Sequence, residues 1–511
     1  MPVRSSKASS ILPISWVPNL GIDLSRPASQ IEDNALATAI NFIYDANSQG
    51  VLVTRAGLRC VTTSALPAPI RQLHHYVKSA TTSYIIGVSG DKVKKLNVAG
   101  TGWDDVYTLP NATVVPSFLN FNGKLLIACG SDSGIAYWDG TTTGHLAGSP
   151  KATAIIEVVN RVAANHKSEP DSVYLCAAEN ETDWNSSGGQ AQALRAGFGD
   201  GLNVNGFAVL YETLVVSKTG GSRKTMYAYD LSGTPTAWKE NRQLLSPGNA
   251  AVNPDSIQAV GDKVYFIDSG GVKGLLPPQV FGSITTDPIL GGRVNRVLAN
   301  YTVTAQSAQL RFSPSSSSIF IIVDAPSGNK ILAFSTTTGA FTELFFGQDT
   351  AGHMLTSLDA DGVVFFAGKS GYLYVLGTDS RDELAPGVLT EYAAIAKSRL
   401  YQGSGHGLVL RQTVIDVEYM SQGSLRLEVY AGDKVALGTY VSYGSSNEDT
   451  IFDAETPIYS AEYALGGIAA TEIVETARVR SHRGLQFLVR CLNGARIVLN
   501  GLTAETAVLQ R

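Results

Sequence analysis

The sequence predicts an all-β protein built from repeated antiparallel meanders. Short stretches rich in Val, Ile, Phe and Tyr, which suit half-buried strands, alternate with turns that hold Gly, Asp, Asn or Ser. The 51 glycines fit a chain with many tight turns. Small sheets that cannot bury both faces alone must pack against one another. Repeated units of this kind therefore predict the blades of a β-propeller over residues 67–380.

The stretch Ser256–Leu276 shows the repeated pattern most clearly. A first strand meets the Gly261-Asp262 turn, Lys263–Ile267 forms a second strand, and a glycine-rich turn at 269–271 leads into a third. Glycine supplies the positive φ that such tight turns need. Comparable β segments lie near residues 69–99, 113–141, 153–186, 204–239, 255–276, 306–343 and 354–378.

These segments predict six or seven blades, and we favour six. In a closed ring, a strand from the beginning of the chain often completes the last blade. Such closure would merge the first and last segments and reduce seven to six.

Residues 1–66 precede the repeats and are predicted to form an N-terminal arm and docking segment. Residues 1–18 are polar with scattered prolines, which favours an extended arm. Ala35–Tyr44 is predicted to be a short helix, with Asp33 or Asn34 as its N-cap. A strand is expected over Val51–Thr54.

An apolar helix face that lies outside the repeats must be covered by another protein surface. Leu36, Ile40 and Ile43 share that face, and together with Arg55 they are predicted to form an interface with another subunit or a docking partner. Deletion of residues 1–59 is therefore expected to leave a soluble propeller that no longer assembles.

Residues 381–511 are predicted to form a separate antiparallel β-sandwich, with Asp379–Ala385 as the linker before it. Apolar and polar residues alternate in this part of the chain, as expected for sheets buried on one face. The predicted strands are Thr413–Tyr419, Ser424–Tyr430, Arg478–Arg480, Gln486–Arg490 and Arg496–Leu499.

Composition excludes several classes of protein. Of the 511 residues, 44% are hydrophobic and 16% are charged, with a net charge of −5, which argues against disorder and against a coat for nucleic acid. No stretch approaches the roughly 20 apolar residues of a membrane span. We expect a soluble protein made in the cytosol, without membrane insertion. The four widely separated cysteines predict reduced thiols in a β core.

The N-terminal segment resembles the start of phage tail proteins. The matching motifs are Gly21–Asp23, Asn41–Asp45 and Gly50–Gly57, the last reading G-V-L-V-T-R-A-G. The likeness is to the tail nozzle family of short-tailed phages, also called tail tubular protein B, tail hub or packaged-DNA stabilization protein. The blades at 173–184 and 264–275 are also similar to that family.

The resemblance implies a structural protein of the virion tail. Six copies would form a ring, a homohexamer, that binds the phage adaptor, continues the portal channel, holds the packaged genome and opens for its ejection. Double-stranded DNA would pass without sequence-specific binding, and tail fibres are a further candidate partner. Assembly would take place in the host cytoplasm.

Two stretches interrupt the regular succession of β segments and are candidates for the gate of such a channel. Asn185–Asn205 is rich in glycine, and Gly197, Gly199 and Gly201 are predicted to let the loop switch between shapes. Pro277–Asn300 is the second candidate and contains a possible helix at 294–299.

Motifs for catalysis are absent from the sequence. No G-x-S-x-G elbow or phosphate-binding loop occurs, and His74 and His75, being adjacent on a strand, point to opposite faces. Asp359–Gly362 resembles part of a calcium loop but predicts a β-turn. We therefore expect no enzyme, no catalytic residues, no cofactor and no metal.

Two other functions are also compatible with the sequence. A monomeric β-propeller can bind a glycan or hydrolyse one, since propellers carry many functions. A minor tail protein of a long-tailed phage would have similar blades.

Overall fold

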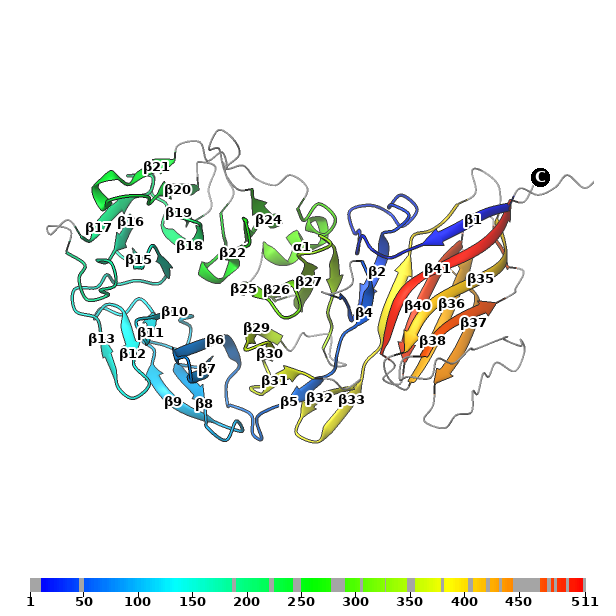
Figure 1. Ribbon diagram of the computed structural model, residues 1–511, viewed down its shortest axis with the longest axis horizontal. Coiled ribbons are helices and arrows are strands. Elements are labelled where there is room, and N and C mark those ends of the chain that lie inside the picture. The colour runs from blue at the N-terminus through cyan, green and yellow to red at the C-terminus, as the bar shows by residue number, and fades with distance from the viewer. Residues whose placement is uncertain are drawn as a thin grey trace, which may run out of the picture.

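The computed structural model shows two β-rich bodies lying side by side, a ring of small sheets and a sandwich of longer strands (Figure 1). The structure describes residues 11–45, 50–185, 190–219, 225–241, 250–276, 290–303, 307–326, 328–346, 354–377, 381–402, 408–419, 423–431, 434–443, 469–475, 479–481, 485–492 and 496–508.

The first four sheets of the ring each contain four antiparallel strands in chain order. Blade 1 holds β6 (Ile70–Ser79), β7 (Thr82–Ser89), β8 (Lys92–Leu96) and β9 (Trp103–Thr108). Blade 2 holds β10 (Ser117–Phe121), β11 (Lys124–Ala128), β12 (Ala136–Trp138) and β13 (Thr143–His145). Blade 3 holds β14 (Ile155–Val158), β15 (Arg161–His166), β16 (Glu169–Leu175) and β17 (Gln192–Arg195). Blade 4 holds β18 (Val204–Leu210), β19 (Thr213–Lys218), β20 (Met226–Asp230) and β21 (Lys239–Asn241).

Three further sheets complete the ring. Blade 5 holds β22 (Ile257–Val260), β23 (Lys263–Asp268) and β24 (Gly271–Leu275). Blade 6 holds β25 (Ser307–Ser313), β26 (Ser318–Ala325), β27 (Gly328–Ser335) and β28 (Phe341–Glu343). Blade 7 holds β29 (Met354–Ala360), β30 (Val363–Gly368), β31 (Leu373–Leu376) and, from far upstream in the chain, β5 (Leu58–Cys60).

The ring is closed, so the body is a β-propeller. The first strand of each blade contacts the first strand of the next, and β29 of blade 7 contacts β6 of blade 1. The described residues thus form seven blades, and the preference for six is wrong. Closure by an upstream strand is confirmed, but β5 adds to three strands already present in blade 7 instead of merging the first and last segments.

Apolar clusters between neighbouring blades hold the ring together. Phe320 and Ile322 of blade 6, for example, pack with Val364 and Phe366 of blade 7. Burying a side chain of this size stabilises the fold by about 1.5–3 kcal/mol. Because each blade covers the faces of its neighbours, the ring buries what a single meander would expose.

The second body is the predicted sandwich. One sheet contains β35 (Leu408–Tyr419), β38 (Ala469–Glu475), β39 (Val479–Ser481) and β41 (Ile497–Val508), joined by the N-terminal strands β1 (Ile11–Trp16), β3 (Phe42–Tyr44) and β4 (Leu52–Thr54). The other contains β34 (Ala394–Ser398), β36 (Gly423–Ala431), β37 (Lys434–Tyr443) and β40 (Leu485–Leu492), joined by β2 (Leu36–Ile40). Residues 11–60 therefore give strands to the sandwich and to blade 7 instead of forming a separate unit.

The helix predicted over Ala35–Tyr44 is wrong. These residues form β2 and β3, and Asn41 between them has a φ of +60°, which a helix does not accommodate. Strand β2 pairs with β34, while β3 pairs with β4, which in turn pairs with β41. Long-range pairing with C-terminal strands thus overrides the helical spacing of the apolar residues.

One sheet runs from the propeller into the sandwich. The outermost strand of blade 6, β28, pairs in parallel with β2 at Glu343 and Ile40, which makes a nine-stranded sheet. The expected linker at 379–385 is partly wrong, because Arg381–Ala385 is strand β32 of a hairpin with β33 (Val388–Glu391). The hairpin lies beside β5 at the junction (Figure 1).

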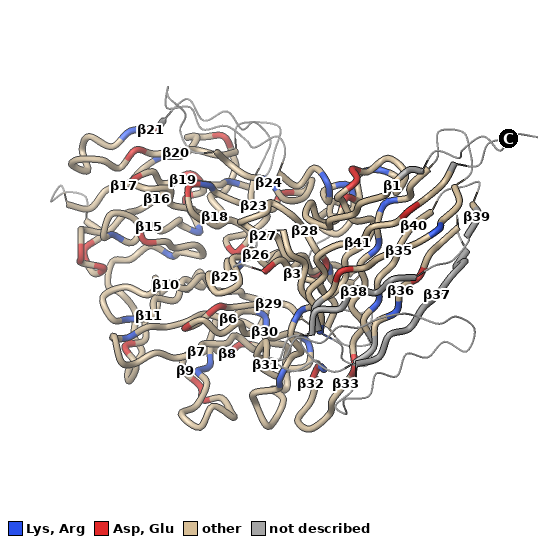
Figure 2. The backbone as a smooth tube through the Cα atoms, turned by 45° about the vertical axis from the view of Figure 1, so that its right-hand side comes forward, with Lys and Arg blue, Asp and Glu red and all other residues tan. Residues whose placement is uncertain are grey.

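Helices are few in the described ranges. The α-helix α1 (Asn295–Thr302) confirms the helix expected near 294–299, and 3-10 turns occupy Pro235–Ala237 and Pro254–Ser256. None of the described helices has the length and apolar character that a membrane span requires. Acidic and basic residues are interspersed over both bodies (Figure 2). The four cysteines are free thiols, as predicted, and Cys129, Cys176 and Cys491 are buried.

Candidate functional site

The predicted interface residues lie between the two bodies of the chain itself. Leu36 is fully buried in the core that the sandwich shares with blades 5 and 6. Ile40 is half-buried and pairs with Ile395 of the sandwich, and Ile43 packs against the core between blades 6 and 7. These side chains therefore do not form an outward-facing apolar surface.

Among the predicted interface residues, Arg55 makes the most polar side-chain contacts. Its guanidinium makes a two-pronged ion pair with Asp382, at 2.7 and 2.6 Å, and both side chains are at most 1% exposed. The same group donates to the side-chain oxygen of Asn41 at 3.0 Å and to the carbonyl of Phe345 at 3.0 Å. Arginine suits this position because its rigid fork of donors can serve a carboxylate and two further acceptors at once.

Two aromatic rings enclose this guanidinium. The central guanidinium carbon of Arg55, Cζ, lies 4.5 Å from the ring centre of Phe346 and 3.8 Å from that of Tyr392. Both distances are within the range of cation–π attraction. Burial raises the pKa of Tyr392 to about 12, although the nearby Arg55 charge opposes the change. Since these partners come from the end of blade 6 and from the segment after the hairpin, Arg55 joins the propeller to the sandwich.

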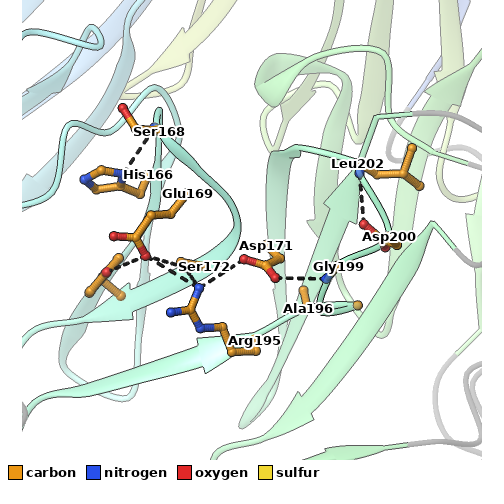
Figure 3. Close-up of polar contacts among 12 residues, drawn as sticks. His166, Ser168, Glu169, Asp171, Ser172, Arg195, Ala196, Gly199, Asp200 and Leu202 are labelled. Carbon is orange, nitrogen blue, oxygen red and sulfur yellow. Dashed lines mark hydrogen bonds and ion pairs between the residues drawn. The ribbon is translucent and has the colours of Figure 1, made fainter.

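The glycines of the first predicted gate lie in the connection from blade 3 to blade 4. Gly197, Gly199 and Gly201 have φ values of +63°, +70° and +77°. These are left-handed backbone conformations that favour glycine, in agreement with the glycine-rich sequence of this stretch. Figure 3 shows the loop folded back on blade 3, with the Gly199 amide donating to Asp171 at 3.2 Å. Residues 186–189 of this stretch lie outside the described residues, and part of the remainder is strand β17.

A buried lysine anchors the same loop to blade 4. Lys218, which is fully buried, pairs with Asp200 at 2.6 Å and donates to the carbonyl of Ala196 at 2.6 Å. Because moving the loop would leave this ammonium without its partners, the contact favours one conformation. The role of the loop as a gate stays a prediction.

A polar cluster beside the loop is satisfied within the chain (Figure 3). Arg195 lies 3.0 Å from Asp171 and 3.5 Å from Glu169. Hydrogen bonds from Ser172 and Tyr174 lower the pKa of Glu169 below its usual value. With two carboxylates around one guanidinium, the cluster gives no site for an anion.

The second predicted gate lies largely beyond the described residues. Positions 277–289 of Pro277–Asn300 belong to this undescribed part. The remaining residues lead into α1, where the Asn295 side chain accepts from the Val272 amide at 2.9 Å and donates to its carbonyl at 2.8 Å. These contacts attach the start of α1 to blade 5.

The propeller axis holds a cavity of about 380 Å³ that the first strands of all seven blades and the 3-10 turn before β22 line. Gln72 of blade 1 donates across the axis to both carboxylate oxygens of Asp255 before blade 5, each at 3.1 Å. Arg311 of blade 6 pairs with the same carboxylate at 2.6 Å. Side chains therefore cross the axis at this level and leave only this small cavity, so a nucleic-acid duplex does not fit through a single propeller.

The two adjacent histidines have separate environments, which confirms that they point to opposite faces. His74 lines the axial cavity, and its Nε2 lies 2.9 Å from the side-chain oxygen of Asn120. Burial lowers the pKa of His74 to about 4, so its ring is neutral at pH 7. His75 lines another pocket, where its Nε2 is 3.6 Å from Asp361.

Across the described ranges, no three His, Cys, Asp or Glu residues gather closely enough to hold a metal ion. The predicted turn after Asp359 is confirmed, with Asp361 and Gly362 at positive φ between β29 and β30. The Asp359 carboxylate accepts hydrogen bonds from Ser313 and Ser315 instead of facing other acidic groups.

Two contacts, one at the junction of the two bodies and one on the propeller axis, were not predicted from the sequence. The Arg55–Asp382 and Gln72–Asp255 pairs join residues 327 and 183 positions apart, and no local motif marks them.

No family model and no curated protein matches the chain. Among solved structures, virginiamycin B lyase from Staphylococcus aureus aligns with a TM-score of 0.42 at 11% identity, over 62% of this chain and 98% of the lyase. The β-propeller domain of Cps50 (Swd1) from Myceliophteria thermophila aligns with a TM-score of 0.40 at 9% identity, over 62% and 98%. The computationally designed Ika8 protein gives 0.36 at 14% identity, over 63% and 99%. The assignment of this chain as a β-propeller rests on its own sheet topology.

Proposed function

We propose that this chain is a structural protein of the tail of a short-tailed phage. Copies of it, six in the arrangement that the resemblance implies, form a ring that continues the portal channel below the adaptor. The ring retains packaged DNA and opens when the genome is ejected. In this role the chain is a rigid building block and carries out no catalysis.

The observation that carries this proposal is the place of the tail-like motifs in the fold. Gly21 lies so close to the backbone of Phe341 that a β-carbon would come within 2.6 Å of its nitrogen and oxygen. Tyr44 donates to the carbonyl of Pro18 at 2.7 Å and accepts from the amide of Gly21 at 2.8 Å. Arg55 makes the buried pair described above. The residues that resemble the tail family are thus the ones that tie the propeller to the sandwich.

Because side chains block the propeller axis, DNA must take another route in this proposal. Since Gln72 and Asp255 meet across the axis, the lumen must lie between copies. The nine-stranded sheet supports such an assembly, because the pairing of β28 with β2 at Glu343 and Ile40 links the two bodies of a subunit directly.

Electron microscopy of virus particles that contain this chain tests the proposal. A ring of copies at the distal end of the tail, labelled by an antibody against the chain, is the expected result. A single copy per particle, or label on the shaft of a long tail, contradicts it and favours a minor tail protein. If the chain is absent from particles and the purified protein is a monomer that binds a glycan, the proposal fails.

A further inference from the structure

The axial cavity contains a buried hydrogen-bond acceptor without a partner. Gln72 is 2% exposed, and its amide nitrogen is committed to the Asp255 carboxylate. This contact fixes the amide, because a flipped group would turn its oxygen toward a carboxylate. The side-chain oxygen of Gln72 then has no hydrogen-bond partner in the described part of the chain. A buried acceptor left in this state costs about 1–3 kcal/mol, so a donor from outside the chain would stabilise it.

The cavity lining also has an excess of acceptors and of negative charge. Its charged side chains are the carboxylates of Asp255 and Asp359 and the guanidinium of Arg311, so the lining has a net charge of −1. His74 adds an acceptor and no charge. Its Nε2–H faces the Asn120 oxygen, because the Asn120 nitrogen donates to the carbonyl of His75 at 2.8 Å, and Nδ1 is left unprotonated.

Aromatic side chains form part of the remaining wall. Phe118, Phe207 and Phe312 come from three different blades and line the same cavity. A cation near an aromatic face is attracted by about 0.5–2 kcal/mol, while a neutral polyol gains no such term.

We propose that the axial cavity binds a small organic cation that carries N–H donors, such as a primary diamine. One ammonium group donates to the Gln72 oxygen and lies near the Asp359 carboxylate, where it offsets the single net negative charge of the lining. The methylene groups and the second ammonium group of the ligand lie against the phenylalanines, where the second charge gains the cation–π attraction. The cavity of about 380 Å³ has room for a molecule of this size. This inference does not depend on a role of the chain in a phage tail.

Isothermal titration of the purified full-length chain with 1,4-diaminobutane tests the site. The expected result is one diamine per chain. Tetramethylammonium, which has charge without N–H donors, and 1,4-butanediol, which has donors without charge, are each expected to bind at least tenfold more weakly. Gln72→Met is expected to weaken diamine binding about tenfold, and Asp359→Asn to weaken it similarly.

Gln309→Met is the matched control. Gln309 is also 2% exposed and also has an unpartnered side-chain oxygen, but it does not line the cavity. Its substitution is expected to leave diamine binding unchanged, with thermal unfolding of each variant reporting on the fold. If Gln72→Met does not fold, Asp359→Asn decides the result.

Three outcomes overturn the proposal. Absence of diamine binding at millimolar concentration means that the cavity holds only water. Equal binding of butanediol means that the site recognises neutral polyols. Equal loss of binding in the Gln72 and Gln309 variants, or no loss in either, places the diamine elsewhere on the protein.

Discussion

Arg55 and Asp382 lie 327 positions apart in the sequence and form an ion pair of 2.6 Å that is almost fully removed from solvent. Arg55 follows the strands that enter the sandwich, and Asp382 lies in the hairpin that follows blade 7. Asp382 also accepts from the amide of Leu58, the first residue of the closing strand β5, at 2.9 Å. One carboxylate thus helps to hold the sandwich junction and the closure of the propeller.

Replacement of Asp382 by Asn should destabilise the protein strongly. The substitution leaves the Arg55 guanidinium buried without a counter-charge, which typically costs about 3–5 kcal/mol. Urea unfolding followed by tryptophan fluorescence measures this loss. Asp33→Asn is the matched control, because Asp33 pairs with Arg399 at the same 2.6 Å but its side chain is 72% exposed. That change should cost less than about 1 kcal/mol. Equal losses in the two variants would contradict a special role for the buried pair.

Deletion of residues 1–59 should prevent a stable propeller from forming. The strand pairing changes the expectation drawn from the sequence, because the deletion removes Leu58 and Arg59 of β5 together with the Arg55 partner of Asp382. Blade 7 then loses its outer strand and the buried Leu58 side chain, which packs in the core between blades 6 and 7. Soluble yield and size-exclusion chromatography report the effect.

Deletion of residues 1–10 serves as the control for this truncation. It leaves every described strand in place, since β1 begins at Ile11, and should give a protein with normal unfolding. A soluble, cooperatively folding chain that begins at residue 60 would refute the importance of β5.

The three gate glycines should differ in their tolerance of alanine. All three have positive φ, so each substitution costs about 1–2 kcal/mol in backbone strain. At Gly197 the new methyl group would also lie 2.1 Å from the Tyr227 hydroxyl and 2.3 Å from the Asp200 carboxylate, whereas nothing lies within 4 Å at Gly199 or Gly201. Gly197→Ala should therefore cost about 1–3 kcal/mol more than the other two. Equal unfolding midpoints for the three variants would show that the loop does not have the described packing.

Local patterns in the sequence predict much of the propeller. The seven β segments correspond to the seven blades because turn residues such as Asn122-Gly123 and Asp361-Gly362 fix where each meander reverses. Helix α1 and the buried thiols are also found as expected. These features depend on neighbours in the chain, which the sequence displays directly.

The N-terminal segment could not be predicted in the same way. Leu36, Ile40 and Ile43 have helical spacing, but strands more than 300 residues away determine their conformation. Strand β2 pairs with β34, and the hairpin of β3 and β4 adds to β41 through β4. The same limit applies to the axial cavity. Gln72, Asp255 and Arg311 carry no motif, and only closure of the ring brings them together.

The axial histidine should make stability depend on pH. Burial lowers the pKa of His74 to about 4, whereas an ordinary histidine titrates near 6.5. Between these values the unfolded chain binds more protons at this position than the folded chain. The contribution of His74 to the free energy of unfolding is therefore fully present above about pH 6.5. It is lost as the pH falls toward 4, and it changes no further at lower pH.

Comparison of the wild type with His74→Gln measures this contribution. Glutamine retains a donor for Asn120 but cannot take up a proton. Between pH 6.5 and 4, the free energy of unfolding of the wild type should fall more steeply, by at most one proton, or about 1.4 kcal/mol per pH unit. Carboxylates elsewhere contribute equally to both proteins and cancel in the difference. Parallel curves for the two proteins would mean that His74 takes up its proton as readily in the folded chain as in the unfolded one.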